Sequence, residues 1–111
     1  MDDDAASVYK REITYPPLTE DEEQSLVSRL SADPDEGELV RLRLVQAHLM
    51  TVVRIAEEYP QSKIHVLDLI LTGNNALLQV VNTYSPSSGE SFSACVERTV
   101  RSAVESAAAF E

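Results

Sequence analysis

The sequence is poor in aromatic residues and cysteine. Aromatics make up 5% of the 111 residues and none is tryptophan, which predicts an aliphatic core of the kind found in small helical bundles. The single cysteine, Cys95, has no second cysteine with which to form an internal disulfide. The two histidines, His48 and His65, are too far apart in sequence to suggest a metal-binding motif. We therefore predict neither a metal site nor a cofactor.

Long apolar runs and enzyme motifs are also absent. No apolar stretch is long enough to span a membrane, and the acidic start MDDDAAS lacks the basic residues of an export signal. We expect a cytoplasmic protein without membrane contact. The chain has no Gly-rich phosphate loop with lysine, no Cys-x-x-Cys pair and no Gly-x-Ser-x-Gly motif, so we predict that it is not an enzyme.

Basic residues are few, and the net charge is −10. Residues 1–38 contain twelve acidic and three basic residues, whereas the remainder contains seven and six. A protein that binds duplex DNA through its phosphates needs clustered lysine and arginine. No such cluster exists here, so we do not expect the chain to bind DNA by itself.

The chain is long enough for one domain with a single core and too short for two ordinary ones. We predict an acidic, partly flexible arm over residues 1–17, which ends at Pro16 and Pro17, and a single domain over residues 18–111. The alternative for the arm is that it docks in an extended form through Val8, Ile13 and Tyr15.

What the sequence does contain is helical periodicity, which predicts an all-α fold, a small bundle of about four helices. The first helix covers about 19–32 and starts with a capping box of Thr19 and Glu22. The second covers about 36–59, the third begins at 64 or 65 and ends at 84, and the fourth begins near 91 or 93 after a Pro- and Ser-rich turn.

The third helix is the most informative. We expect one wide buried face on it, formed by Leu67, Ile70, Leu71, Leu77, Leu78 and Val81. Gly73 lies in its interior, where glycine costs roughly 1 kcal/mol relative to alanine. A glycine at such a position indicates that a neighbouring backbone or a partner approaches closely.

His48 lies between apolar neighbours in the second helix. We interpret it as a histidine that is hydrogen-bonded at a helix interface, because no acid, base or nucleophile is evidently paired with it. The acidic pairs Glu22/Glu23 and Glu57/Glu58 are typical of solvated helix faces.

Several residues of the third helix occur in an order that resembles the second domain of sigma-70-like bacterial RNA polymerase sigma factors. The matching residues, without a gap, are Asp68, Leu69, Ile70, Gly73, Asn74, Leu77, Leu78, Tyr84 and Pro86. The segments 18–30 and 43–59 resemble the two preceding family helices, so the resemblance covers about residues 18–104.

The resemblance implies that the third helix attaches to the clamp helices of the largest subunit of core RNA polymerase. The polymerase-binding positions would be Asp68, Leu71, Thr72, Gly73 and Asn74. Leu71 and Thr72 replace two polar family residues, an acid and an amide, that meet a basic partner, so this contact would be weakened. Asp68 and Asn74 could equally form hydrogen bonds within the bundle.

The resemblance also implies that the fourth helix faces the −10 promoter element. At the positions of a family tyrosine and two tryptophans, which stack on unpaired bases, this sequence has Cys95, Arg98 and Thr99. Ser102 and Glu105 stand where the family has polar residues that contact the promoter duplex, and Arg101 lies beside them. We therefore expect promoter melting and −10 readout to be weakened or lost.

Two functions remain open. The first is a sigma-like protein of transcription initiation or its regulation that contacts core RNA polymerase or a sigma regulator, and that binds promoter DNA only weakly and within a complex. The second is a helical protein-interaction module that keeps the fold without binding polymerase. A fully active promoter-reading sigma factor is disfavoured by the missing aromatic and basic residues. The sequence leaves open a homodimer, and also whether the chain is an excised domain or a one-domain relative.

Overall fold

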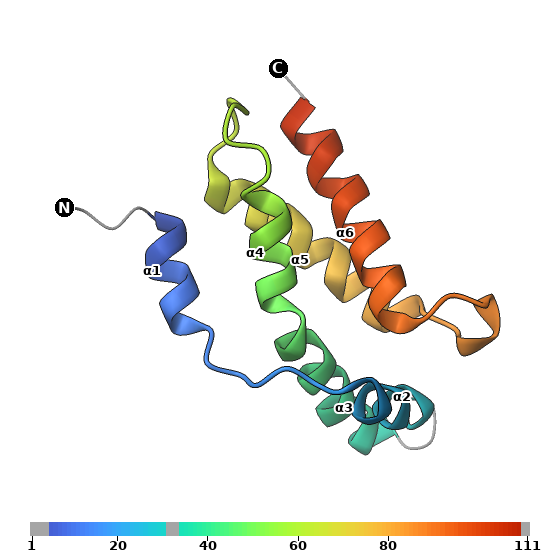
Figure 1. The fold of residues 1–111 in the computed structure, drawn as a ribbon. Coiled ribbons are helices and arrows are strands. Elements are labelled where there is room, and N and C mark those ends of the chain that lie inside the picture. Colours follow the sequence, from blue (N-terminus) through green and yellow to red (C-terminus); the bar gives the residue numbers. More distant parts are fainter. Residues whose placement is uncertain (1–4, 31–33, 110–111) are drawn as a thin grey trace.

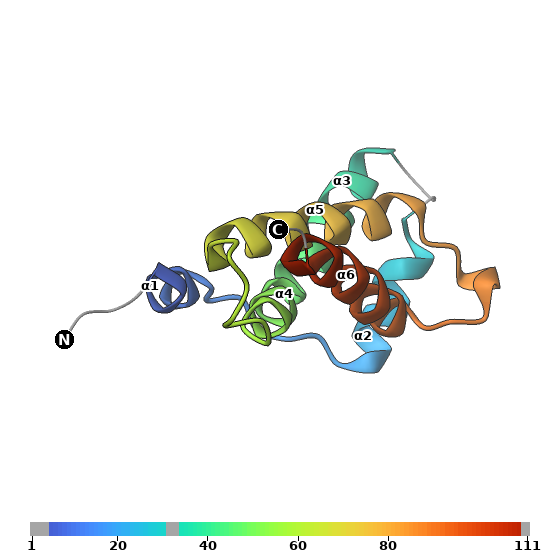
Figure 2. The same ribbon diagram turned by 90° about the horizontal axis from the view of Figure 1, so that it is seen from above.

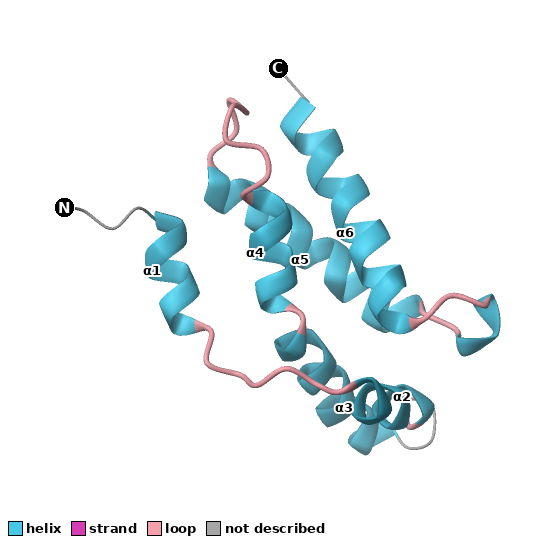
Figure 3. Cartoon of the chain, in the orientation of Figure 1, coloured by secondary structure: helices cyan, strands magenta, loops and turns pink. Residues whose placement is uncertain are grey.

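Helices are the only regular secondary structure in the part of the chain that the structure, a computed structural model, describes, namely residues 5–30 and 34–109. Figures 1 and 3 show how these helices follow one another. The elements are α1 (Ala5–Glu12), α2 (Glu20–Ser28), α3 (Pro34–Ala47), α4 (Leu49–Ala56), α5 (Val66–Thr83), the short 3-10 helix η1 (Pro86–Ser88) and α6 (Phe92–Ala109). The predicted all-α class is confirmed.

The core lies where α4 and α6 pack against α5 (Figures 1 and 2). In α6 the buried residues recur every four positions, which places them in one row along the helix. Leucine, isoleucine and valine dominate this core, as the scarcity of aromatics predicted. The largest fully buried side chains are Leu44, Ile55, Leu69, Leu77, Val52, Val53, Val96, Val100 and Val104.

The buried face predicted for α5 is wrong in part. Ile70, Leu77 and Val81 are buried, but Leu67, Leu71 and Leu78 are 40%, 58% and 47% exposed. The remaining buried positions of the helix are Leu69, Gly73, Ala76 and Val80. Apolar residues cover more than half of the circumference of this helix, so its periodicity alone does not select which part of that arc is buried. The small residues Gly73 and Ala76 determine which side of α5 is buried, because they allow other helices to approach on that side.

The bundle has more helices than the four predicted. The expected second helix is divided at His48, whose backbone angles, φ −113° and ψ 6°, interrupt the helix between α3 and α4. The expected third and fourth helices, now α5 and α6, are confirmed to within about two residues at each boundary. The first helix, now α2, starts as predicted with the Thr19–Glu22 capping box but ends at Ser28 instead of residue 32.

The segment that precedes α2 contains helix α1, where we expected extended or partly disordered chain; for residues 5–12 that expectation was wrong. Ala6 is buried, and Tyr9 and Ile13 pack against the core. Their spacing of three and four is a helical signal, but an eight-residue helix is not stable by itself. It therefore depends on its contacts with α4 and α5. The boundary at residue 18 between arm and domain stays a prediction.

Gly73 is the position at which three helices meet. A Cβ atom placed on it would lie 2.6 Å from Val52 Cγ1 of α4, and 3.2 Å and 3.3 Å from methyl carbons of Val104 and Val100 of α6. A separation of 2.6 Å is too short for two carbon atoms, so any side chain at residue 73 would push α4 and α6 away from α5.

We predict that Gly73→Leu lowers the free energy of unfolding by about 3 kcal/mol or more, because overpacking of a well-packed site costs roughly 1–3 kcal/mol even for small insertions. Thr72→Ala, at the half-buried neighbouring residue, serves as the control and should change stability far less. Urea unfolding of the two variants beside the wild type measures the difference. Equal unfolding free energies would show that the packing of the bundle does not require the absence of a side chain at residue 73.

Candidate functional site

The residues predicted to bind polymerase do not all lie on the surface of α5. Asp68 and Leu71 are exposed, and Thr72 is half-buried. Gly73 is buried between α4 and α6. A partner that approaches α5 from solvent therefore meets Asp68, Leu71 and part of Thr72, whereas Gly73 acts only through the packing of the bundle.

Asn74 connects α5 to α1. Its Nδ2 donates a hydrogen bond to the hydroxyl oxygen of Tyr9 over 3.2 Å. Its Oδ1 is buried and has no hydrogen-bond partner among the described residues. Of the two roles left open for Asn74, the geometry favours the one within the bundle. An ion pair also connects α1 to the end of α4, because Lys10 Nζ lies 3.0 Å from a carboxylate oxygen of Glu57.

The exposed side of α5 carries a row of leucines, Leu67, Leu71 and Leu78, which we term the leucine stripe. The spacings of four and seven residues place the three side chains on one side of the helix. Exposed polar but uncharged residues border the stripe, namely Asn75, Gln79 and Asn82. Asp68 is the only charged residue of α5. This surface is therefore apolar at its centre and almost free of charge.

The residues predicted to face DNA lie along α6 with different exposures. Arg98, Ser102 and Glu105 are exposed, whereas Cys95, Thr99 and Arg101 are half-buried. The Cys95 and Thr99 side chains lie one turn apart, with 3.9 Å between the sulfur and the hydroxyl oxygen. All six residues therefore lie on α6, and one of the exposed residues among them, Glu105, is an acid.

Arg98 is neutralised within the chain. Its Nε and Nη2 each donate to one carboxylate oxygen of Glu90 over 2.9 Å, a two-point contact of the kind that suits a guanidinium. The hydrogen bonds from Arg98 lower the pKa of the Glu90 carboxyl. A phosphate that approached Arg98 would have to replace this carboxylate.

Arg101 is neutralised in the same way, by an acid of the turn that follows α4 and an acid of α6. It donates to Glu58 and, over 2.8 Å, to Glu97 Oε2. Arg54 of α4 also binds Glu97, over 2.9 Å. The hydrogen bonds from Arg101 are the main cause of the lowered pKa values of Glu58 and Glu97. These two acids and two arginines stabilise the contact between α4 and α6 and leave little positive charge for DNA.

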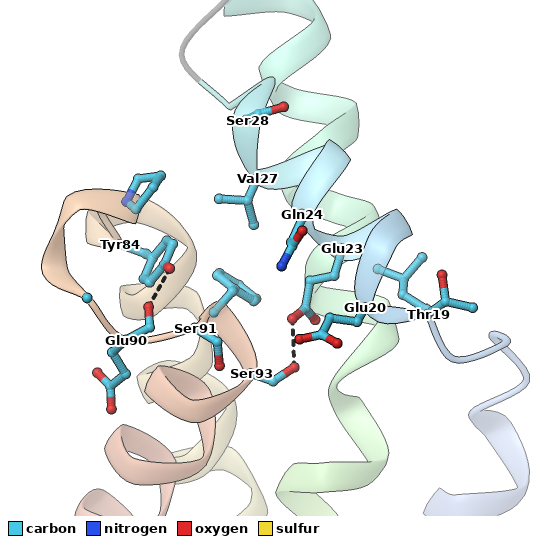
Figure 4. A pocket seen from close by; sticks show the side chains of 14 residues that line it. Thr19, Glu20, Glu23, Gln24, Val27, Ser28, Tyr84, Glu90, Ser91 and Ser93 are labelled. Atoms are coloured by element: carbon cyan, nitrogen blue, oxygen red, sulfur yellow. Dashed lines mark hydrogen bonds between the residues drawn. The ribbon is translucent and has the colours of Figure 1, made fainter.

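A pocket of about 570 Å³ lies between α2 and the start of α6 (Figure 4). Apolar side chains, including Val27, Tyr84 and Phe92, form part of its wall. Figure 4 shows Glu23 reaching from α2 to Ser93, whose hydroxyl donates to Glu23 Oε2 over 2.7 Å. The acids Glu20, Glu23 and Glu90 all line this pocket, so it does not favour an anionic ligand.

Glu23, His48 and Ser93 form a polar contact that the sequence did not reveal. His48 Nε2 lies 2.7 Å from Glu23 Oε1, and both residues are buried. The interpretation of His48 as a hydrogen-bonded residue at a helix interface is confirmed, whereas the view that no acid is paired with it was wrong. Glu23 had also been assigned to a solvated face. Its position four residues before buried Val27, on the apolar side of α2, was the available signal.

Burial by itself would raise the pKa of the Glu23 carboxyl, but the hydrogen bonds with His48 and Ser93 and the charge of the His48 ring outweigh it. The pKa therefore lies below the ordinary value of 4.5. A glutamate whose pKa falls on folding stabilises the folded state above its unfolded pKa. That stabilisation is lost as the pH falls through the folded pKa.

We predict that Glu23→Gln lowers the free energy of unfolding at neutral pH by roughly 1–3 kcal/mol, because His48 and Ser93 lose a charged acceptor. The difference from the wild type should shrink below about pH 4.5, where Glu23 begins to be protonated in the unfolded chain. Urea unfolding between about pH 7 and about pH 3 measures this difference. Glu20→Gln, an exposed acid of the same helix, is the control for removal of a charge. A constant difference at all pH values would contradict the assignment.

No protein-family model matches the chain. It is 33% identical over 108 residues to the RNA polymerase sigma factor SigA of Lactococcus lactis subsp. cremoris, and equally so to SigA of L. lactis subsp. lactis strain IL1403. It is 32% identical over 104 residues to the RNA polymerase sigma factor RpoS of Coxiella burnetii. These matches cover 96%, 96% and 94% of this chain and 30%, 28% and 29% of the relatives.

The matches extend further than the resemblance noted in the sequence. Because 96% of the chain is covered, they include most of the first 17 residues and therefore part of α1, whereas the resemblance began at residue 18.

No helix among residues 5–30 and 34–109 is long and apolar enough to cross a membrane. The chain spans about three tenths of the length of the curated relatives that it matches, and over almost its own whole length it is similar to RNA polymerase sigma factors.

Proposed function

We propose that this chain is a sigma-like protein of transcription initiation or its regulation that attaches to core RNA polymerase through the outer side of α5. The observation that carries the proposal is the exposure of the leucine stripe and Asp68 on the helix that resembles the core-binding helix of sigma factors. The attachment point would be the clamp helices of the largest polymerase subunit. A regulator of sigma factors that recognises the same helix is the second candidate for the partner.

We further propose that promoter melting and −10 readout are weakened or lost. Stacking on unpaired bases needs aromatic side chains, and the chain has no tryptophan. Arg98 and Arg101 are held by acids of the chain itself. Promoter DNA would then contact this protein only within a larger complex, if at all.

One observation favours the alternative function, a helical interaction module without polymerase. Gly73 and Asn74, two residues shared with the family motif, serve packing and the contact with α1, so their presence is explained without a partner. The two functions differ in one measurable property, which is direct binding to core polymerase.

We expect purified core RNA polymerase to retain the tagged chain in a pull-down. Leu71→Arg is the test variant, because a cation on the exposed centre of the stripe would be repelled by a basic partner and would be buried on binding at a cost of several kcal/mol. It should abolish retention while leaving the circular dichroism spectrum unchanged. Failure of the wild-type chain to bind core polymerase at any tested concentration would support the interaction-module function instead.

We predict no measurable binding of the isolated protein to duplex or single-stranded −10 DNA at physiological salt. The net charge of −10 and the internal pairing of the α6 arginines remove the phosphate contacts on which such binding depends. Fluorescence anisotropy with labelled promoter strands measures it. A dissociation constant below about 1 μM, equivalent to about −8.2 kcal/mol, would overturn this part of the proposal.

The lost stacking surface can be restored. Cys95→Tyr combined with Arg98→Trp and Thr99→Trp should raise the affinity for −10 single strands by roughly 1–3 kcal/mol per stacked base. Arg98 is exposed, whereas Cys95 and Thr99 are half-buried, so circular dichroism must first show that the variant is folded. Arg98→Ala is the control that breaks the pair with Glu90 without adding an aromatic ring. An affinity no higher than that of the control would show that α6 is not presented to DNA as in the family.

A further inference from the structure

Asn74 lies within the row of the leucine stripe, three residues after Leu71 and four before Leu78, so the three side chains share one side of α5. Unlike these leucines, Asn74 is half-buried. Its Nδ2 donates to the Tyr9 hydroxyl of α1 over 3.2 Å, and α1 contacts both α4 and α5. Helix α1 therefore covers the asparagine in the middle of the surface that we propose for attachment.

Few contacts hold α1 in this position. It lies at the edge of the bundle, on the opposite side of α4 from α6 (Figures 1 and 2). A helix of eight residues is not stable without its neighbours, and Ala6 is the one buried residue among the eight. The side chains of its ion pair, Lys10 and Glu57, are 35% and 38% exposed, and exposed pairs contribute little to stability. A hollow of about 490 Å³ between Ala6 and Val66 of α5 shows that this end of α1 is loosely packed.

The chain that follows α1 is anchored before α2 begins. Arg43 Nη2 of α3 donates to the carbonyl oxygen of Pro16 over 2.9 Å, and the capping box at Thr19 then starts α2. Residues 13–15 connect this anchor to α1 without regular structure. Helix α1 can therefore leave the bundle by movement of this short connection while α2 stays in place.

Tyr9 satisfies only half of the Asn74 amide. The Oδ1 atom of Asn74 is buried and has no hydrogen-bond partner among the described residues, and a buried acceptor without a donor is unfavourable. Departure of α1 would open both polar atoms of the amide to a partner, which can donate to Oδ1 and accept from Nδ2. The docked position of α1 is thus less stable than a fully paired contact would be.

We infer that α1 is a displaceable cover of the attachment surface, and that core RNA polymerase binds the form of the chain in which α1 has left Asn74. This inference rests on the proposed function and adds a regulatory step to the same surface. Only molecules with α1 undocked are competent to bind, so the measured dissociation constant exceeds the intrinsic one by the inverse of their fraction. A change that loosens α1 without altering α5 should therefore tighten binding.

The test is the affinity of the full chain for core RNA polymerase, measured for the wild type and for Tyr9→Phe. Loss of the hydrogen bond to Asn74 should increase the undocked fraction and lower the dissociation constant roughly two- to tenfold. Tyr15→Phe is the matched control, because Tyr15 is 45% exposed and lies outside α1. Its affinity should equal that of the wild type.

Hydrogen exchange of the free chain measures the opening of α1 directly. The amides of α1 should exchange faster than those of α5 in the wild type, and faster still in Tyr9→Phe. Protection of α1 equal to that of α5 in both proteins would contradict a displaceable cover.

Two further variants separate the release of α1 from a change in charge. Lys10→Gln and Glu57→Gln each remove the ion pair that holds α1, but they change the net charge in opposite directions. Both should tighten binding, by a smaller factor than Tyr9→Phe. Opposite effects of the two variants would show that charge and not α1 governs the affinity.

The outcomes distinguish this inference from the proposed function. Unchanged or weaker binding by Tyr9→Phe would overturn the inference and leave the proposed attachment intact, and weaker binding would place α1 within the docking surface. If neither the wild type nor Tyr9→Phe binds core polymerase, the proposed function is overturned, and the inference with it.

Discussion

The close approach of α4 and α6 to Gly73 sets the rotation of α5 about its own axis. Because Val52, Val100 and Val104 occupy the space where a side chain would be, residue 73 must face inward, and Leu69, Leu77 and Val80 then turn inward with it. The leucines on the other side, Leu67, Leu71 and Leu78, are exposed as a consequence. The exposure of the surface proposed to bind a partner therefore follows from the packing of the core around Gly73.

Several charged groups of this protein bind one another within the chain. Glu23 holds His48 and Ser93 at a point where α2, the break between α3 and α4, and the start of α6 come together. Arg54 of α4 and Arg101 of α6 are bound by Glu97 of α6, and Arg101 also by Glu58, which follows α4. The Glu23–His48 contact, which is buried, fixes the relative positions of these helices most strongly, because breaking one partner of a buried pair leaves an uncompensated group. The arginine pairs also leave α6 without the positive potential that DNA binding requires.

Similarity to SigA and RpoS sigma factors covers almost the whole chain, and the structure indicates which features of the resemblance are structural. Gly73 and Asn74 serve the packing of α5 against its neighbours, so a chain that had lost every polymerase contact would still need them to fold. Of the residues at the positions of the family's aromatic residues, Arg98 is exposed, Cys95 and Thr99 are half-buried, and Cys95 packs against the core. A sigma-like scaffold with altered surface residues fits the function proposed above, attachment to polymerase without opening of DNA.

Local signals in the sequence determined where α2 begins and where α5 and α6 lie. The Thr19–Glu22 capping box, the Pro- and Ser-rich turn before α6 and the apolar periodicity that marks α5 and α6 as helices each act over a few residues, and these elements were found where predicted. The tertiary structure decided which side of α5 is buried, that His48 interrupts a helix, that residues 5–12 are helical, and that Glu23 pairs with a histidine 25 positions away. These features depend on contacts between residues far apart in sequence. A helix whose apolar residues cover more than half of its circumference, or a short helix without partners, carries no local signal strong enough to specify them.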